Sequence, residues 1–491
     1  MKRKWVENNN MASVKKNFLY QSAYEILVII LPLITSPYIS RVLGPENLGI
    51  YSYTYSIAYY FSLFASLGIK YYGNRRIAQA RNSKQELSKV FSEILYAHLV
   101  TSCIVLVIYL GYVSFFVKEN QLYSYIQAIY VLGSVFDLNW FFFGMEKFDV
   151  TVKRNTIIKI LTVISIFAFV RRKTDLIIYI WIMALGNLLA QLYLWTKLKR
   201  EVSICTVSIK ACFRHLKPLC MLFIPLAASS IYQVLSKIIL GNISGDYQLG
   251  LFDNTQKLIN IPMSLVIAFG NVMLPKMSNM FKNYDQEKGM IYLERTVPLI
   301  MCIAFSLCFG LISVADIFAP VFWGKEFSAA SKLVAFNALV IPFYAFANML
   351  RTQFLIPRGR DNVYTFAMVG GAVINIIVNI ILIPYYGAMG AVCGNIAAEA
   401  SVSVIQAVWI RKEVRIKRYI KLGVPFFIIG FFMYFVVKFV GKFVDQNVIG
   451  LAVEIALGAL VYCTLSLIYF IKSKNEFVLS ILKNIKRKWI K

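Results

Sequence analysis

Apolar residues gather along this chain in long runs, which short polar and charged stretches separate. The runs recur from residue 18 to residue 471, and about 20 apolar residues are the length that a helix needs to cross a bilayer. The pattern therefore predicts an all-α membrane protein with about 14 transmembrane helices. The expected spans are residues 18–40, 50–72, 92–116, 121–143, 156–170, 175–196, 217–240, 252–274, 297–315, 332–350, 363–383, 388–410, 422–440 and 448–471.

Composition and charge support a membrane protein. The chain is 59% hydrophobic with a mean hydropathy of +0.64, which is far above the values of soluble domains. Its net charge of +28 does not indicate nucleic-acid binding, because the basic residues lie between the spans and not on one soluble domain. Most of them fall in alternate loops, so the positive-inside rule predicts that both termini are cytoplasmic. The outer turn Arg171-Arg172-Lys173 breaks this pattern and leaves the orientation of the fifth and sixth spans open.

Cysteine and histidine give no sign of a metal or catalytic centre. The eight cysteines follow no CxxC or Cys/His spacing, and His98 and His215 are the only histidines. We therefore expect no cofactor and no metal site. The first span lacks a small-x-small cleavage site, so we expect it to remain in the mature protein.

An internal sequence repeat predicts that the chain contains two related halves. Residues 32–36 (PLITS) resemble residues 225–229 (PLAAS), and both segments are followed by Leu-Gly and then by Gly-aliphatic-aromatic. The copies begin six spans apart, so they would form parallel repeats: two six-helix lobes around a central cavity, plus two C-terminal helices. The expected segments are a basic N-terminus (1–17), an N-lobe (18–196), a linker (197–216), a C-lobe (217–410), two appended helices (411–471) and a basic tail (472–491).

Three segments resemble the signatures of Wzx-type polysaccharide flippases, which belong to the multidrug/oligosaccharidyl-lipid/polysaccharide exporter superfamily. They are residues 41–52 (RVLGPENLGIYS), residues 137–146 (DLNWFFFGME), and the pair NIIVN and PYYGAMGA at 375–379 and 384–391. The resemblance covers nearly the whole chain and fades beyond residue 420. It implies that the protein turns an undecaprenyl-pyrophosphate-linked oligosaccharide from the cytoplasmic to the outer leaflet of a bacterial inner or plasma membrane by alternating access.

Polar side chains within the spans are candidates to line the route of such a headgroup, because charge and unpaired hydroxyl groups are costly in hydrocarbon. The expected cavity residues are Lys257, Lys237, Gln233, Asn260, Tyr53 and Tyr60. The segment that begins at Lys257 is similar to one in the lipid II flippases of the superfamily, and this similarity implies contact with pyrophosphate. In the competing interpretation these side chains join helices by hydrogen bonds or reach out to the membrane surface.

Acidic residues within spans are candidates for ion coupling, and prolines for bending. We expect Glu25, Glu399 and Asp137 to couple transport to H⁺ or Na⁺, although Asp137 also fits a helix cap or a pair with Lys147. Glu454, in the appended helices, is interpreted as structural. The expected hinges are Pro32, Pro225 and Pro262.

Two other classes of protein stay open at this point. An ion-coupled exporter of small molecules would share the fold, but its cavity should be smaller and more acidic for cationic drugs. A membrane glycosyltransferase or polymerase would need convergent acid and base groups, which the sequence lacks. The resemblance implies as further partners membrane lipids, a polysaccharide polymerase and a chain-length regulator.

Overall fold

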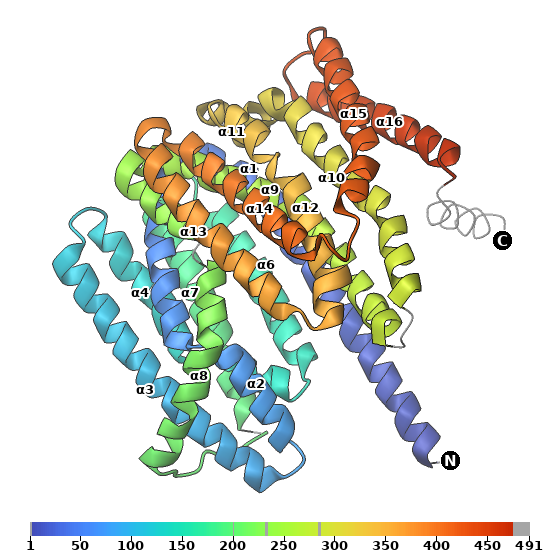
Figure 1. Cartoon of the computed structure of the whole chain (residues 1–491). Coiled ribbons are helices and arrows are strands. Elements are labelled where there is room, and N and C mark those ends of the chain that lie inside the picture. Colours follow the sequence, from blue (N-terminus) through green and yellow to red (C-terminus); the bar gives the residue numbers. More distant parts are fainter. Residues whose placement is uncertain (1, 200, 231–233, 283–285, 475–491) are drawn as a thin grey trace. The chain divides into compact units, whose positions relative to one another are not determined.

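The computed structural model describes residues 2–199, 201–230, 234–282 and 286–474, with side chains from residue 30 onward except at 224–226, 228, 229 and 286. All regular elements within these ranges are helices (Figure 1). Ten of the described helices are long and apolar enough to cross a bilayer. The prediction of an all-α protein that crosses the membrane several times is confirmed, while the number of fourteen spans stays a prediction.

The helices form two compact units, Met1–Ser230 and Ile231–Lys491. The first contains α1 (Lys2–Ser66), α2 (Ile69–Ala80), α3 (Lys84–Phe116), α4 (Gln121–Val135), α5 (Asn139–Gly144), α6 (Phe148–Phe169), η1 (Lys173–Asp175), α7 (Leu176–Leu198) and α8 (Ile209–Ser230). Helix α8 contacts α2 and α3 of this unit. The lobe boundaries that the sequence predicts remain predictions.

The second unit continues the chain from α9 to α16. It contains α9 (Ser236–Lys282), α10 (Gln286–Trp323), η3 (Lys325–Phe327), α11 (Ala330–Asn337), α12 (Val340–Leu350), η4 (Arg351–Leu355), η5 (Ile356–Arg358), α13 (Asp361–Tyr386), α14 (Ala388–Ile410), α15 (Ile416–Gly441) and α16 (Val448–Lys472). Small residues allow α13 and α14 to approach closely, as where Gly371 lies against Ala398 and Val402. Helix α15 packs against α10 and α16.

Each unit contains one long helix that breaks at a single glycine. In α1 the break is Gly44, with φ 77° and ψ 171°, and in α9 it is Gly245, with φ 81° and ψ 175°. This backbone region is essentially restricted to glycine, because a Cβ atom would meet the neighbouring backbone. The two glycines therefore mark the same kind of junction, which divides a continuous run into two helical segments.

The backbone conformation corrects the alignment between the two copies of the internal sequence repeat. The sequence pattern pairs Gly44 with Gly241, but the residue that shares its conformation is Gly245. In the corrected register Thr54 aligns with Thr255. The hydroxyl groups of these two threonines donate to the carbonyl oxygens of Ile50 and Leu251, at 2.9 and 2.8 Å. The two long helices thus repeat each other in backbone and in side-chain hydrogen bonding.

Candidate functional site

Two lysines share one buried carboxylate in the second unit. Lys237 Nζ lies 2.5 Å from Asp253 Oδ1, and Lys257 Nζ lies 2.7 Å from Asp253 Oδ2. All three residues belong to α9, on opposite sides of the break at Gly245. The Asp253 side chain is 3% exposed, whereas that of Lys257 is 44% exposed. The structure thus brings the two predicted cavity lysines together, and their role in binding stays a prediction.

Asp253 holds the lysines but does not neutralise them both. A buried carboxylate is stable only with close positive partners, and here each of its oxygens has one. The lysine–aspartate cluster, as we call Lys237, Asp253 and Lys257, therefore keeps an excess of positive charge. Its most exposed member is Lys257, so an incoming anion would meet that ammonium group first.

Sequence reasoning missed Asp253. It considered four acids within the spans and passed over this one, although Asp253 and Lys257 stand four residues apart on one helix face. The spacing of four residues could have identified Asp253 as the partner of Lys257 from the sequence. The second partner was harder to find, because Lys237 lies sixteen residues earlier and reaches Asp253 only after the chain has turned at Gly245.

A network of polar side chains lies beside the lysine–aspartate cluster. Gln256 Oε1 accepts hydrogen bonds from Asn337 Nδ2 at 3.1 Å and from Asn395 Nδ2 at 2.9 Å. These contacts connect α9 with α11 and α14. Gln256 directly precedes Lys257, so α9 presents one residue to the network and the next to the carboxylate.

The same network continues to the start of α9. Ser236 Oγ donates to Asn375 Oδ1 at 3.0 Å and accepts from Asn379 Nδ2 at 2.8 Å. Asn375 Nδ2 in turn donates to Asn395 Oδ1 at 3.4 Å. The side chains of Ser236, Asn375, Asn379 and Asn395 are buried and uncharged. We call Ser236, Gln256, Asn337, Asn375, Asn379 and Asn395 the amide network, and it fixes the helices that carry the cluster.

The remaining cavity candidates of the second unit lie near these groups or outside the described residues. Asn260 is exposed on α9 and accepts a hydrogen bond from Gln256 Nε2 at 3.5 Å. Gln233 lies outside the described residues. Pro262 is buried within a helical part of α9, and Pro32 lies within α1. Pro225 belongs to α8, but its side chain is outside the described part, so the hinge roles stay predictions.

The three acids proposed for ion coupling have different surroundings. Glu399 is buried on α14. Asp137 lies between α4 and α5, where it accepts hydrogen bonds from the backbone N–H of Asn139 at 2.8 Å and from its side chain at 2.6 Å. The N-cap residue of α5 is Leu138, so the predicted roles of Asp137 in capping and in coupling stay predictions. The side chain of Glu25 is outside the described part.

Aromatic side chains of the first unit pack together at positions that were not among the predicted cavity residues. Tyr55 packs at 4.9 Å from Tyr130, and Tyr51 at 4.9 Å from Tyr179, measured between ring centroids. The predicted cavity residues of this unit were Tyr53 and Tyr60. Both are partly buried, and the Tyr60 hydroxyl donates to the carbonyl oxygen of Ser230 at 3.3 Å.

A buried histidine joins α2, α3 and α8 in the first unit. His215 Nε2 lies 2.9 Å from Glu93 Oε2, and His215 Nδ1 lies 2.6 Å from the Tyr72 hydroxyl. Sequence reasoning gave no role to this histidine. Because Tyr72 and Glu93 come from different helices, the contacts fasten α8 to the first unit. Among the described residues no group of three or more His, Cys, Asp or Glu side chains is placed to hold a metal ion.

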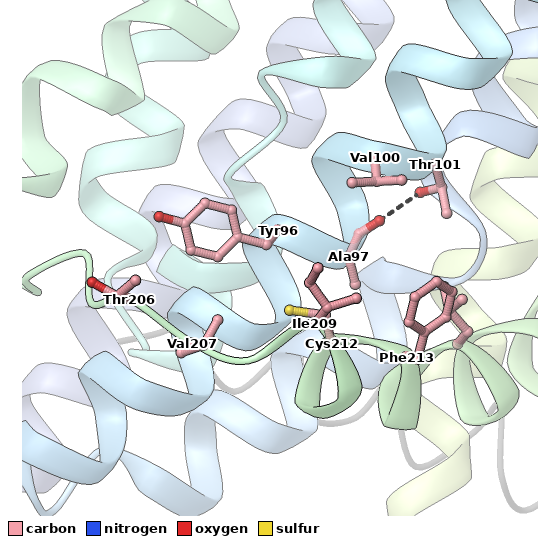
Figure 2. A pocket seen from close by; sticks show the side chains of 10 residues that line it. Tyr96, Ala97, Val100, Thr101, Thr206, Val207, Ile209, Cys212 and Phe213 are labelled. Atoms are coloured by element: carbon pink, nitrogen blue, oxygen red, sulfur yellow. Dashed lines mark hydrogen bonds between the residues drawn. The ribbon is translucent and has the colours of Figure 1, made fainter.

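An apolar pocket of about 520 Å³ lies beside this histidine, between α3, the segment 206–207 and α8 (Figure 2). Figure 2 shows Tyr96 and Val100 on α3 and Phe213 on α8. The Thr101 hydroxyl donates to the Ala97 carbonyl oxygen at 3.1 Å, so its polar group is satisfied. No charged side chain lines the pocket, which separates it in character from the lysine–aspartate cluster.

This chain is similar in sequence to two known proteins and in fold to one solved structure. The chain is 27% identical over 390 residues to a putative O-antigen transporter of Shigella dysenteriae, covering 79% of this chain and 97% of the relative. It is 24% identical over 414 residues to a putative O-antigen transporter of Escherichia coli (strain K12), covering 83% and 99%. The solved structure of the lipid II flippase MurJ in an inward closed conformation shares the fold, with a TM-score of 0.76, 17% identity, and coverage of 93% and 99%.

The family match spans more of the chain than one unit. The model of the family described as polysaccharide biosynthesis protein matches residues 14–281. This region begins in α1 and ends in α9, so it includes both glycine junctions and the whole lysine–aspartate cluster. Because the match extends over more than half of the sequence, this chain belongs to the polysaccharide biosynthesis protein family.

Proposed function

We propose that this protein is a flippase that moves an undecaprenyl-pyrophosphate-linked oligosaccharide repeat unit from the cytoplasmic to the outer leaflet of the cell membrane. The repeat unit would then serve the synthesis of a surface polysaccharide. Membership of the polysaccharide biosynthesis family supports this function, as do the O-antigen transporters among the relatives. The observation that carries the proposal is the buried Asp253 carboxylate between two lysines of a membrane helix.

The lysine–aspartate cluster supplies what a pyrophosphate needs within a membrane. Moving a phosphate into a region of low dielectric is very costly unless cations accompany it. Asp253 holds both ammonium groups in place. When the anion arrives, Lys257 would turn from the carboxylate to the phosphate and Lys237 would balance Asp253, so the cluster would offset one of the two negative charges of the pyrophosphate.

Lysine suits a ligand that must leave again. Its ammonium group is a point charge without the planar fork of arginine, so it neutralises a phosphate but orients it less tightly. Asn260, exposed one turn after Lys257, offers an amide to the sugar next to the pyrophosphate. The excess of positive charge also disfavours a cationic drug as the substrate, which weakens the alternative of a multidrug-type exporter.

The orientation and the coupling belong to the same proposal. The excess of basic residues in alternate loops supports an orientation with both termini in the cytoplasm. Transport would proceed by alternating access, with H⁺ or Na⁺ as coupling ion and with Glu399, Asp137 and Glu25 as the candidate acids. A polysaccharide polymerase and a chain-length regulator would take over the product. No covalent bond of the substrate changes in this process.

Deletion of the gene tests the proposal in the cell. Without the protein, lipid-linked oligosaccharide should accumulate on the cytoplasmic leaflet while surface polysaccharide disappears, and a plasmid copy should restore both. Normal surface polysaccharide in the deletion strain, with no accumulation of the lipid-linked precursor, would refute the function.

A further inference from the structure

A basic hollow lies at the elbow between α14 and α15 in the second unit. Helix α14 ends at Ile410 and α15 begins at Ile416, and the hollow that the elbow forms measures about 690 Å³. Five basic and two aliphatic side chains line it: Arg411, Val414, Arg415, Ile416, Lys417, Arg418 and Lys421. No carboxylate is among them.

Among the described residues, most of these cations have no ion-pair partner. Arg418 pairs with Glu294 at 2.5 Å. Within the described part of the chain no ion pair forms at the other four basic residues, which are Arg411, Arg415, Lys417 and Lys421. Like charges that share one hollow repel each other, and a bound anion would remove that repulsion. We call these four residues the elbow cations.

A neighbouring hollow contains both acidic and basic side chains. It measures about 630 Å³ and shares Arg415 and Arg418 with the elbow, but three carboxylates also line it, those of Glu287, Glu294 and Glu413. Glu413 is the one acid between residues 411 and 421. It is turned away from the elbow, because it pairs with Arg358 at 2.8 Å and with Arg360 at 2.5 Å. The protein thus supplies its own anions to one hollow and none to the other.

An apolar track leads away from the elbow cations along α15. Ile420, Val424, Phe427 and Phe431 are between 45% and 57% exposed, and their spacing places them on one face of the helix. The track rises about 16 Å from Ile420 to Phe431 at 1.5 Å per residue. This length is about half of the hydrocarbon core, which is the depth of one leaflet.

We propose that the elbow between α14 and α15 binds the anionic headgroup of a membrane phospholipid, whose acyl chains lie along the exposed face of α15. Basic hollows at the ends of membrane helices attract anionic lipid headgroups. A soluble anion would match the elbow cations but not the apolar track, whereas a phospholipid matches both. This site is separate from the lysine–aspartate cluster on α9 and does not depend on the transport function proposed above.

Lipid titration of the purified full-length protein tests the site. Native mass spectrometry would count bound dioleoylphosphatidylglycerol, with dioleoylphosphatidylcholine as the neutral lipid. The variant carries Arg411→Gln, Arg415→Gln, Lys417→Gln and Lys421→Gln. We expect its affinity for phosphatidylglycerol to fall by about tenfold or more, while its affinity for phosphatidylcholine stays unchanged.

A control variant separates this site from general surface charge. Lys84→Gln, Lys89→Gln, Lys210→Gln and Lys217→Gln together remove the same charge from exposed positions of the first unit. The control should lose less than about twofold in affinity for phosphatidylglycerol. Both variants must keep the helical circular dichroism of the wild type. Equal losses in the two variants, unchanged binding in the elbow variant, or displacement of the lipid by millimolar inorganic phosphate would each overturn the proposal.

Discussion

The Asp253 carboxylate lies 2.7 Å from the Lys257 ammonium group, one helical turn further along α9. Its other oxygen is taken by Lys237 at 2.5 Å, from the far side of the break at Gly245. One buried carboxylate therefore connects the two segments of the helix as well as the two lysines. Its removal should affect stability, whereas removal of Lys257 should affect transport.

Asp253→Asn should destabilise the protein, because it leaves two lysines close together without a carboxylate. A fully buried pair loses roughly 3–5 kcal/mol when one partner is removed, and the exposure of Lys257 reduces this to about 1–3 kcal/mol. The measurement is thermal unfolding of the purified protein in one detergent. Adding Lys237→Met should recover part of the loss. If the double variant unfolds no later than the single one, the lysine–aspartate pairing does not stabilise the fold.

Gly245→Ala should lower the unfolding free energy by about 1–3 kcal/mol, because φ near +81° with an extended ψ is strained for any residue with a Cβ atom. Gly310 is the matched control. At both glycines no atom outside the adjoining backbone lies within 4 Å of where a Cβ would stand, but Gly310 has no positive φ. Gly310→Ala should leave the stability equal or slightly higher. Equal behaviour of the two variants would contradict the role of backbone conformation at the junction.

Asn375→Ala should lower the unfolding free energy by about 1–3 kcal/mol, because it removes partners from the buried side chains of Ser236, Asn379 and Asn395. Asn362→Ala changes the same residue type at an exposed position of the same helix, α13, and should have little effect. Chemical or thermal unfolding of both variants gives the comparison. A loss of similar size in both would show that the amide network adds nothing specific.

The pattern of apolar runs was enough to predict an all-helical membrane protein, because a membrane span needs about 20 apolar residues whatever its neighbours are. The pattern placed the breaks in the polar stretches 41–49 and 241–251, between predicted spans, but it could not assign them to a residue. Gly44 and Gly245 both lie in these stretches, and the internal sequence repeat pointed to Gly241 instead of Gly245. Only the backbone conformation shows which glycines adopt a positive φ at a helix break.

The candidate site was partly predictable for a similar reason. A lysine within a membrane span is costly, so Lys237 and Lys257 stood out in the sequence. Asparagine, serine and tyrosine are common in spans as contacts between helices, so the amide network and the cluster around Tyr55 did not stand out. Their members are brought together by packing between helices that are distant in the sequence.

Cysteine labelling tests the proposed orientation. In a variant without the eight native cysteines, Asp246→Cys should react with an impermeant thiol reagent added to intact cells, and Lys84→Cys should react only after the membrane is opened. The reason is the excess of Lys and Arg in the loops assigned to the cytoplasm. The reverse labelling would overturn the orientation.

The most direct test of the central claim measures flipping itself. Purified protein would be placed in liposomes that contain a fluorescent lipid-linked oligosaccharide, and the fraction that reaches the opposite leaflet would be followed over time. Lys257→Ala should reduce the rate by about tenfold or more, Lys257→Arg should keep much of it, and Lys257→Glu should be lowest, since the site must neutralise a pyrophosphate. Lys276→Ala is the control on the same helix, because Lys276 lies against the Tyr292 ring away from the cluster. A rate in Lys257→Ala equal to that of the wild type, at equal reconstitution, would contradict the account.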